Sequence, residues 1–167
     1  MSLVLVAYGS KHGATAEIAE AIAAELRAAG HDADCIPADR VRAIDRYEAV
    51  VVGSAIYMKR WRPEARRLLR RHGKVLAERP LWIFSSGPCG EKPDPSWSEP
   101  RSVVARAEQL GARDHVVFGG RLPLEPGNFV ERAMVDSCPP ESRDLRDWDE
   151  IRGWAAKIAA DAIKSRG

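Results

Sequence analysis

The feature that most constrains the fold is the stretch Leu3–Leu26, where an apolar run, a glycine-containing turn and a helical pattern follow one another. Leu3–Ala7 is almost continuously apolar, which is typical of a strand covered on both faces in a parallel sheet. From Ala14 the apolar residues recur at helical spacing, and Gly30 follows as a stop. The sequence therefore predicts a strand, a turn and a helix in direct succession.

The turn is a candidate phosphate site made of Ser10, Lys11, His12, Gly13, Ala14 and Thr15. A strand-to-helix turn directs unpaired backbone N–H groups and the positive end of the helix dipole at one point. The hydroxyl groups of Ser10 and Thr15 add further donors. The alternative is an ordinary helix N-terminus with capping residues. A capping box is absent, however, because Ile18 stands three residues after Thr15 in place of Glu or Gln.

Spacing excludes two common phosphate motifs. A P-loop needs a wider glycine frame followed by lysine, whereas Gly9 and Gly13 are only four residues apart and Ala14 follows. A dinucleotide fingerprint needs a middle glycine where this chain has Lys11. What remains is Ser-x-x-Gly-x-Thr at the end of a first strand.

The totals favour a single soluble domain. The chain has 167 residues, of which 45% are hydrophobic and 30% are charged. No apolar run approaches the ~20 residues of a membrane span, and no export signal is visible, so a cytoplasmic location is expected. Cys35, Cys89 and Cys138 are far apart and have no His or Cys at ligand spacing, so neither a disulfide nor a metal site is expected.

Further apolar runs predict a parallel sheet with helices on both faces. They cover His31–Pro37, Tyr47–Ala55, Pro80–Ser85 and Val116–Leu122, and helical patterns or short crossovers separate them. With the first strand they make five, and we expect the order 2-1-3-4-5. In such a sheet, the strand ends at the switch point form the ligand crevice.

Two more turns should therefore lie beside the first one. The third strand ends in Ser54, Ala55, Ile56 and Tyr57, and the fourth ends in Ser85, Ser86, Gly87, Pro88 and Cys89. Small residues allow close approach to a flat ligand, and larger apolar ones, including Met58 and Trp61, can cover it. The alternative for Tyr57 and Trp61 is plain packing.

The segment Lys59–Lys74 is strongly basic. Its basic residues are Lys59, Arg60, Arg62, Arg66, Arg67, Arg70, Arg71 and Lys74, against Glu64 alone. The segment thus carries about +7, and the rest of the chain about −5, of a net charge of +2. On a helix, the arginines would point outward from a buried stripe of Trp61, Ala65, Leu68, Leu69 and Leu76. Two interpretations stay open: a solvated helix face, which is the commoner role, and a docking surface.

The stretch Pro123–Arg146 is irregular, and Pro139-Pro140 interrupts it. Phe129, Val130, Ala133 and Met134 predict one short amphipathic helix inside it. The last helix is expected to start at Asp147.

Taken together, these stretches resemble the flavodoxin-like FMN proteins, in the group that contains the quinone-dependent protoporphyrinogen oxidases. The resemblance rests on YGSKHGATAEIAEAIA, VVVGSAIYMKRW, LWIFSSGP, GGRL and RDWDEIRGWAAKIA, and it covers nearly the whole chain. The chain departs from those oxidases between Arg121 and Arg146, where they have a longer, more apolar and more basic insertion.

The resemblance implies noncovalent FMN, with its phosphate on Ser10–Thr15 and its ring between the Ser54–Tyr57 and Ser85–Cys89 turns. It also implies an FMN-dependent oxidoreductase that takes electrons from a small-molecule redox substrate and passes them to a quinone. Protoporphyrinogen is the leading substrate, and no catalytic residue is assigned. A flavodoxin-type electron carrier and a flavin-free binding module are the alternatives. The isoelectric point near 8.5 argues against the carrier, which tends to have an acidic surface.

A quinone acceptor gives the docking interpretation of Lys59–Lys74 a partner. Basic side chains near an anionic leaflet would hold the protein peripherally at the inner face of the membrane. Nucleic acid is not expected as a partner, because the segment shows no recognised nucleic-acid motif and only one aromatic residue, Trp61. An oligomer is compatible with the sequence.

Overall fold

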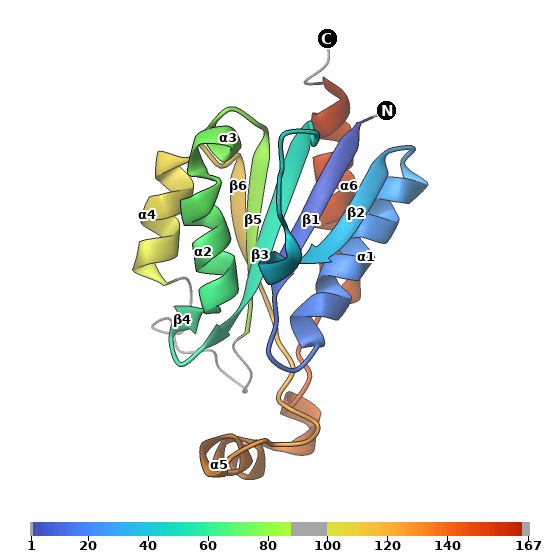
Figure 1. Cartoon of the computed structure of the whole chain (residues 1–167). Coiled ribbons are helices and arrows are strands. Elements are labelled where there is room, and N and C mark those ends of the chain that lie inside the picture. The colour runs from blue at the N-terminus through green and yellow to red at the C-terminus, as the bar shows by residue number, and fades with distance from the viewer. Residues whose placement is uncertain (1, 88–99, 165–167) are drawn as a thin grey trace.

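A computed structural model describes residues 2–87 and 100–164 and has a single sheet between two layers of helices (Figure 1). The elements are β1 (Leu3–Gly9), α1 (Ala14–Ala28), β2 (Asp32–Pro37), η1 (Ala38–Arg40), β3 (Ala49–Tyr57), β4 (Arg60–Trp61), α2 (Pro63–Arg71), α3 (Gly73–Ala77), β5 (Leu81–Ser86), α4 (Arg101–Gln109), β6 (Asp114–Phe118), α5 (Phe129–Ser137), η3 (Pro140–Ser142) and α6 (Trp148–Lys164). The predicted α/β class is confirmed.

The sheet runs in the order β2-β1-β3-β5-β6, and all of these strands are parallel. This is the predicted order 2-1-3-4-5 when only the parallel strands are numbered. The short strand β4 was not predicted. It pairs antiparallel with the end of β3, with Tyr57 opposite Arg60.

The β3–β4 turn lies later than predicted. Ser54–Tyr57 belongs to β3, and the chain reverses at Met58 and Lys59, whose φ angles are 53° and 63°. Two consecutive positive φ angles form the type I′ hairpin turn, whose twist matches that of the strands. That turn usually contains Asn-Gly. Because Met58-Lys59 stands there instead, the sequence did not predict the turn.

The two faces of the sheet bury two cores. α1 and α6 cover one face, while α2 and α4 cover the other (Figure 1). Alternation along β1 shows the division, since Val4 and Val6 pack with α1 and α6, whereas Leu5 and Ala7 pack on the opposite side. Continuous apolar strands thus bury side chains on both faces of the sheet, as the sequence predicted.

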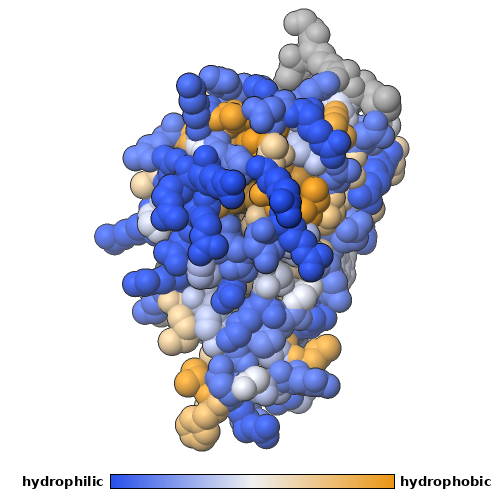
Figure 2. Space-filling model, in the orientation of Figure 1, coloured by the Kyte–Doolittle hydropathy of each residue, from blue (hydrophilic) through white to orange (hydrophobic). Residues whose placement is uncertain are grey.

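The basic segment is divided between three elements and is not one helix. Trp61 lies in β4, α2 ends at Arg71, and Leu76 lies in α3. The predicted inner stripe is confirmed, because Trp61, Ala65, Leu68, Leu69 and Leu76 are all buried. Arg66, Arg67, Arg70 and Arg71 are exposed on α2, where Figure 2 shows a hydrophilic surface.

The segment between β6 and α6 projects from the edge of the sheet at which β1 ends (Figure 1). Its predicted helix exists as α5, but the apolar residues that predicted it do not form a buried face. Phe129 is 84% exposed and Val130 is 50% exposed, whereas Glu131 is only 1% exposed. The predicted start of the last helix is confirmed, since the Asp147 carboxylate accepts a hydrogen bond from the backbone N–H of Glu150 at 3.2 Å.

Within the described ranges, no helix combines the length and the apolar character that crossing a bilayer requires. The predicted site residues Pro88 and Cys89 fall outside those ranges.

Gly53 has no room for a side chain, because a Cβ there would lie 2.0 Å from Cζ of Phe84. We expect Gly53→Ala to displace the Phe84 ring and to lower the free energy of unfolding by about 1–3 kcal/mol, as measured by urea denaturation. Gly153→Ala on α6 is the matched control, since nothing lies within 4 Å of its Cβ position. That control should be neutral or stabilising. Equal effects of the two substitutions would contradict the packing argument.

Candidate functional site

The parallel register brings three strand ends together. Gly9 of β1 lies opposite Ser54 of β3, which in turn lies opposite Ser85 of β5. One residue further on, Ser86 lies between Ala55 and Phe118. The turns that follow β1, β3 and β5 are therefore neighbours at one edge of the sheet, which is the arrangement predicted from the sequence.

The turn after β1 leads into α1 through a glycine. Gly13 is the N-cap of α1 with φ 88°, and its N–H donates to Ser10 Oγ at 3.0 Å. Among the described residues, no side chain caps the start of α1 through this position. A left-handed glycine before an uncapped helix forms a concave set of backbone donors, which suits an anion.

The hydroxyl groups on β3 and β5 have structural partners. Ser54 Oγ accepts a hydrogen bond from the Arg62 backbone N–H at 2.9 Å, and Ser85 Oγ accepts one from Trp61 Nε1 at 2.8 Å. Both serines are fully buried. They hold β4 against the sheet, whereas the neighbouring Ala55, Ile56 and Tyr57 are half-buried.

The turn after β5 is held close to the end of β6. Gly87 has φ 103°, and its N–H donates to the carbonyl of Phe118 at 3.0 Å. A Cβ on Gly120 would lie 2.8 Å from Cα of Gly87, so the two backbone segments approach as closely as glycine allows. This contact fixes Gly87 beside the end of β6.

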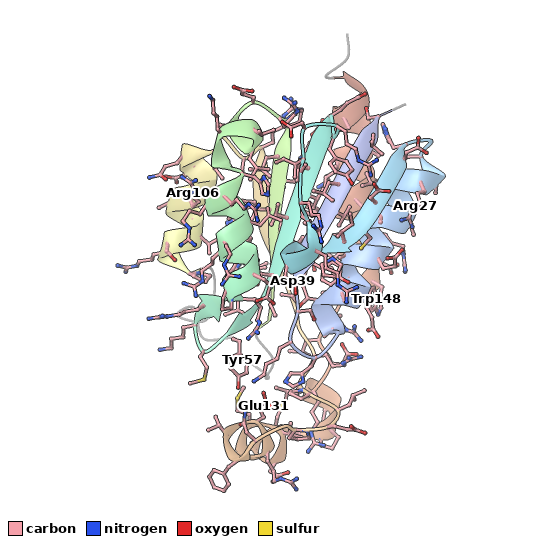
Figure 3. All side chains as sticks on the ribbon, in the orientation of Figure 1. Arg27, Asp39, Tyr57, Arg106, Glu131 and Trp148 are labelled. Carbon is pink, nitrogen blue, oxygen red and sulfur yellow. The ribbon has the colours of Figure 1, made fainter. Side chains whose placement is uncertain are left out.

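A buried carboxylate joins α5 to two of the turns. Glu131 Oε1 lies 2.5 Å from Lys11 Nζ and 2.9 Å from His12 Nε2, and it accepts a hydrogen bond from the Tyr57 hydroxyl at 3.1 Å. Glu131 Oε2 accepts a hydrogen bond from the backbone N–H of Gly127 at 2.7 Å. Figure 3 shows Tyr57 and Glu131 facing each other across the space between the sheet edge and α5.

These contacts keep Glu131 ionised. Hydrogen bonds from Lys11 and His12 lower the pKa of Glu131 from its ordinary value to about 2, although burial acts in the opposite direction. The hydrogen bond with Glu131 also raises the pKa of Lys11. The Lys11 ammonium lies over the Tyr57 ring, 4.0 Å from its centroid, so one cation contacts both residues.

A second set of charges fixes the base of the projecting segment to α1. Glu17 binds the guanidinium groups of Arg121 and Arg146, and Arg146 also pairs with Asp144 at 2.8 Å. Arg121 additionally donates to the carbonyl of His12 at 3.4 Å, so it lies against the first turn. Its Nε is buried and has no hydrogen-bond partner among the described residues.

Sequence reasoning missed Glu131 and Arg121. One signal was present, because Asn128 stands three residues before Glu131, as in a capping motif. Asn128 does cap α5, accepting a hydrogen bond from the Glu131 N–H at 2.9 Å. This motif predicts where α5 begins, but the partners of the Glu131 side chain come from turns 74 and 119 residues away in the sequence.

Comparison with known families agrees with this geometry. The model of a family described as "Flavodoxin domain" matches residues 5–144. The chain belongs to the flavodoxin domain family. Proteins of this family bind FMN, so the cofactor predicted from the sequence is confirmed at the level of the family.

Individual relatives are distant. Protoporphyrinogen IX dehydrogenase [quinone] from Escherichia coli strain K12 is 23% identical over 93% of this chain and 93% of its own length. Oxidised flavodoxin 1 from Bacillus cereus superposes with a TM-score of 0.63 at 15% identity, covering 98% of each chain. Rubredoxin oxygen:oxidoreductase from Desulfovibrio gigas gives a TM-score of 0.65 at 16% identity, with 98% of this chain matching 37% of that one. These superpositions show the fold.

The donor set fits FMN. The start of α1, the Ser10 and Thr15 hydroxyls and Arg121 Nε, which has no partner within residues 2–87 and 100–164, are all suited to a phosphate or to a polar chain attached to it. The predicted phosphate residues Ser10–Thr15 and the ring-side residues Ala55–Tyr57 and Ser86–Gly87 lie at the same edge. Their contact with the cofactor stays a prediction.

Proposed function

We propose that the protein is an FMN-dependent oxidoreductase that takes electrons from a small reduced substrate and passes them to a quinone, with protoporphyrinogen as the first substrate to test. FMN would supply the redox chemistry, and the protein would supply position and polarity around it. A redox role follows from the family, and the similarity to the Escherichia coli dehydrogenase supports this particular substrate.

The observation that carries the proposal is the position of α5. The helix stands beside the turns predicted to hold the flavin, and Glu131 ties it to both the first turn and Tyr57. An electron carrier has to present its flavin edge to protein partners, whereas an additional wall at that edge would position a small substrate. The net charge of +2 also lacks the acidic character that steers carriers to basic partners.

Within this proposal, each group has a defined task. The N–H groups at the start of α1 would bind the phosphate, with the Ser10 and Thr15 hydroxyls beside them. Tyr57, whose hydroxyl donates to Glu131 in the structure, would lie along the flat ring. Met58, which is 60% exposed at the tip of the β3–β4 turn, would border the entry for the substrate.

Steady-state turnover tests this function. We expect the FMN-loaded protein to oxidise protoporphyrinogen in a reaction that depends on a menaquinone analogue, at a rate above that of free FMN in the same buffer. Porphyrin formation is followed by fluorescence. No turnover together with fast electron exchange with a flavodoxin reductase would identify an electron carrier. No activity in either assay would indicate a binding module.

We also propose that the exposed arginines of α2 dock the protein on an anionic membrane, where a quinone resides. Arg66, Arg67, Arg70 and Arg71 share the solvent side of α2, and its buried side is Ala65, Leu68 and Leu69. Each basic residue near an anionic leaflet contributes about 1 kcal/mol, which salt screens. Several such charges would give reversible attachment without an inserted segment.

Vesicle co-sedimentation tests the docking surface. We expect the protein to bind vesicles rich in phosphatidylserine but not neutral ones, and Arg66→Glu with Arg70→Glu to reduce binding by at least about tenfold, because four units of charge change near the leaflet. Arg152→Glu with Lys157→Glu is the matched control, since both residues are exposed on α6, which covers the opposite face of the sheet. Equal binding of the two double variants would show that α2 is only a solvated face.

A further inference from the structure

Glu131 is buried on a helix whose apolar side chains are exposed. Among the described residues of α5, Glu131 is the one that is buried, at 1% exposure, while Phe129 and Val130 face solvent. Burying a carboxylate is unfavourable unless charged and hydrogen-bonding partners compensate for its lost hydration. Apolar burial on α5 is therefore a minor contribution, and we attribute the position of the helix mainly to the partners of this carboxylate.

Those partners are the kinds of group that bind a phosphate. Lys11 Nζ, His12 Nε2 and the Tyr57 hydroxyl converge on one carboxylate oxygen at 2.5, 2.9 and 3.1 Å. Lys11 and His12 belong to the turn in which the cofactor phosphate is expected. The Glu131 carboxylate is thus an anion already bound to the side chains of a phosphate turn.

We propose that Glu131 is an internal competitor for the cofactor phosphate: its carboxylate engages Lys11 and His12, and a phosphate bound on Ser10–Thr15 draws these side chains away and loosens α5. This inference rests on the proposed FMN site. It assigns Glu131 two effects, which are to weaken phosphate binding and to hold α5 against the sheet edge.

The two effects are linked thermodynamically. If the contacts of Glu131 oppose phosphate binding by some factor, phosphate binding must weaken those contacts by the same factor. FMN would then increase the opening of α5, and the cofactor content of the protein would set how firmly the wall beside the flavin is closed. A carboxylate that merely oriented Lys11 toward the phosphate would instead strengthen phosphate binding, and FMN would then reduce the opening of α5.

Titration of the cofactor-free protein with FMN and with riboflavin tests the proposal, because riboflavin has the same ring without the phosphate. Quenching of flavin fluorescence gives both dissociation constants. We expect Glu131→Gln to bind FMN about tenfold more tightly than the wild type, within the usual range of coupling between sites. Its affinity for riboflavin should be unchanged. Glu125→Gln is the matched control, since Glu125 is an exposed acid of the same projecting segment.

Two further measurements keep the test independent of the folding of one variant. In a Lys11→Met background, the gain from Glu131→Gln should fall, because one of the two competed cations is missing. In the wild type, hydrogen exchange of the α5 amides should accelerate when FMN binds, and in Glu131→Gln it should be fast with or without FMN.

The outcomes separate the two proposals. Weaker FMN binding by Glu131→Gln, or slower exchange of α5 on FMN binding, would overturn the competition and make Glu131 a positioning residue. An equal change for FMN and riboflavin would overturn it as well, since the effect would not concern the phosphate. Failure of the wild type to bind either flavin would instead contradict the proposed FMN function.

Discussion

The alignment of the carboxyl ends of β1, β3 and β5 is the constraint on which the rest of the structure depends. Because these strands are parallel and buried on both faces, their register fixes which residues meet at the edge, and Gly9, Ser54 and Ser85 lie in one row. Side chains cannot be added freely here: a Cβ on Gly9 would lie 2.9 Å from Cβ of Arg62, and one on Gly53 would overlap the Phe84 ring. Close packing of the sheet itself thereby positions the starts of the three turns.

Polar contacts, in contrast, position the segment that projects from this edge. Its base is fixed by the charges of Glu17, Arg121 and Arg146, and its helix by Glu131. Such contacts depend on the partner charges and can be exchanged for others, unlike the interdigitated side chains of the two cores. The molecule therefore combines a closely packed sheet edge with a segment held by ion pairs.

The sequence predicted what depends on local pattern and on topology. Apolar strands, the helical period after Ala14 and the turn residues Ser10–Thr15 were sufficient for the sheet order and for which strand ends lie side by side. Contacts between distant segments were not predictable in this way. The Met58-Lys59 hairpin lacks its usual glycine signal, so β4 was missed. Phe129 and Val130 helped to predict an amphipathic helix, whose apolar side chains are normally buried, whereas in α5 they are exposed and Glu131 is buried against cations of another turn.

FMN is expected to bind at the edge formed by β1, β3 and β5 through its phosphate and its ring. Calorimetric titration of the cofactor-free protein with FMN measures this binding. We expect saturation at one FMN per chain, and loss of most of that affinity when Gly13→Val forces a β-branched residue into the left-handed conformation at φ 88°. No heat of binding from a folded wild-type protein, or unchanged affinity in Gly13→Val, would contradict this expectation.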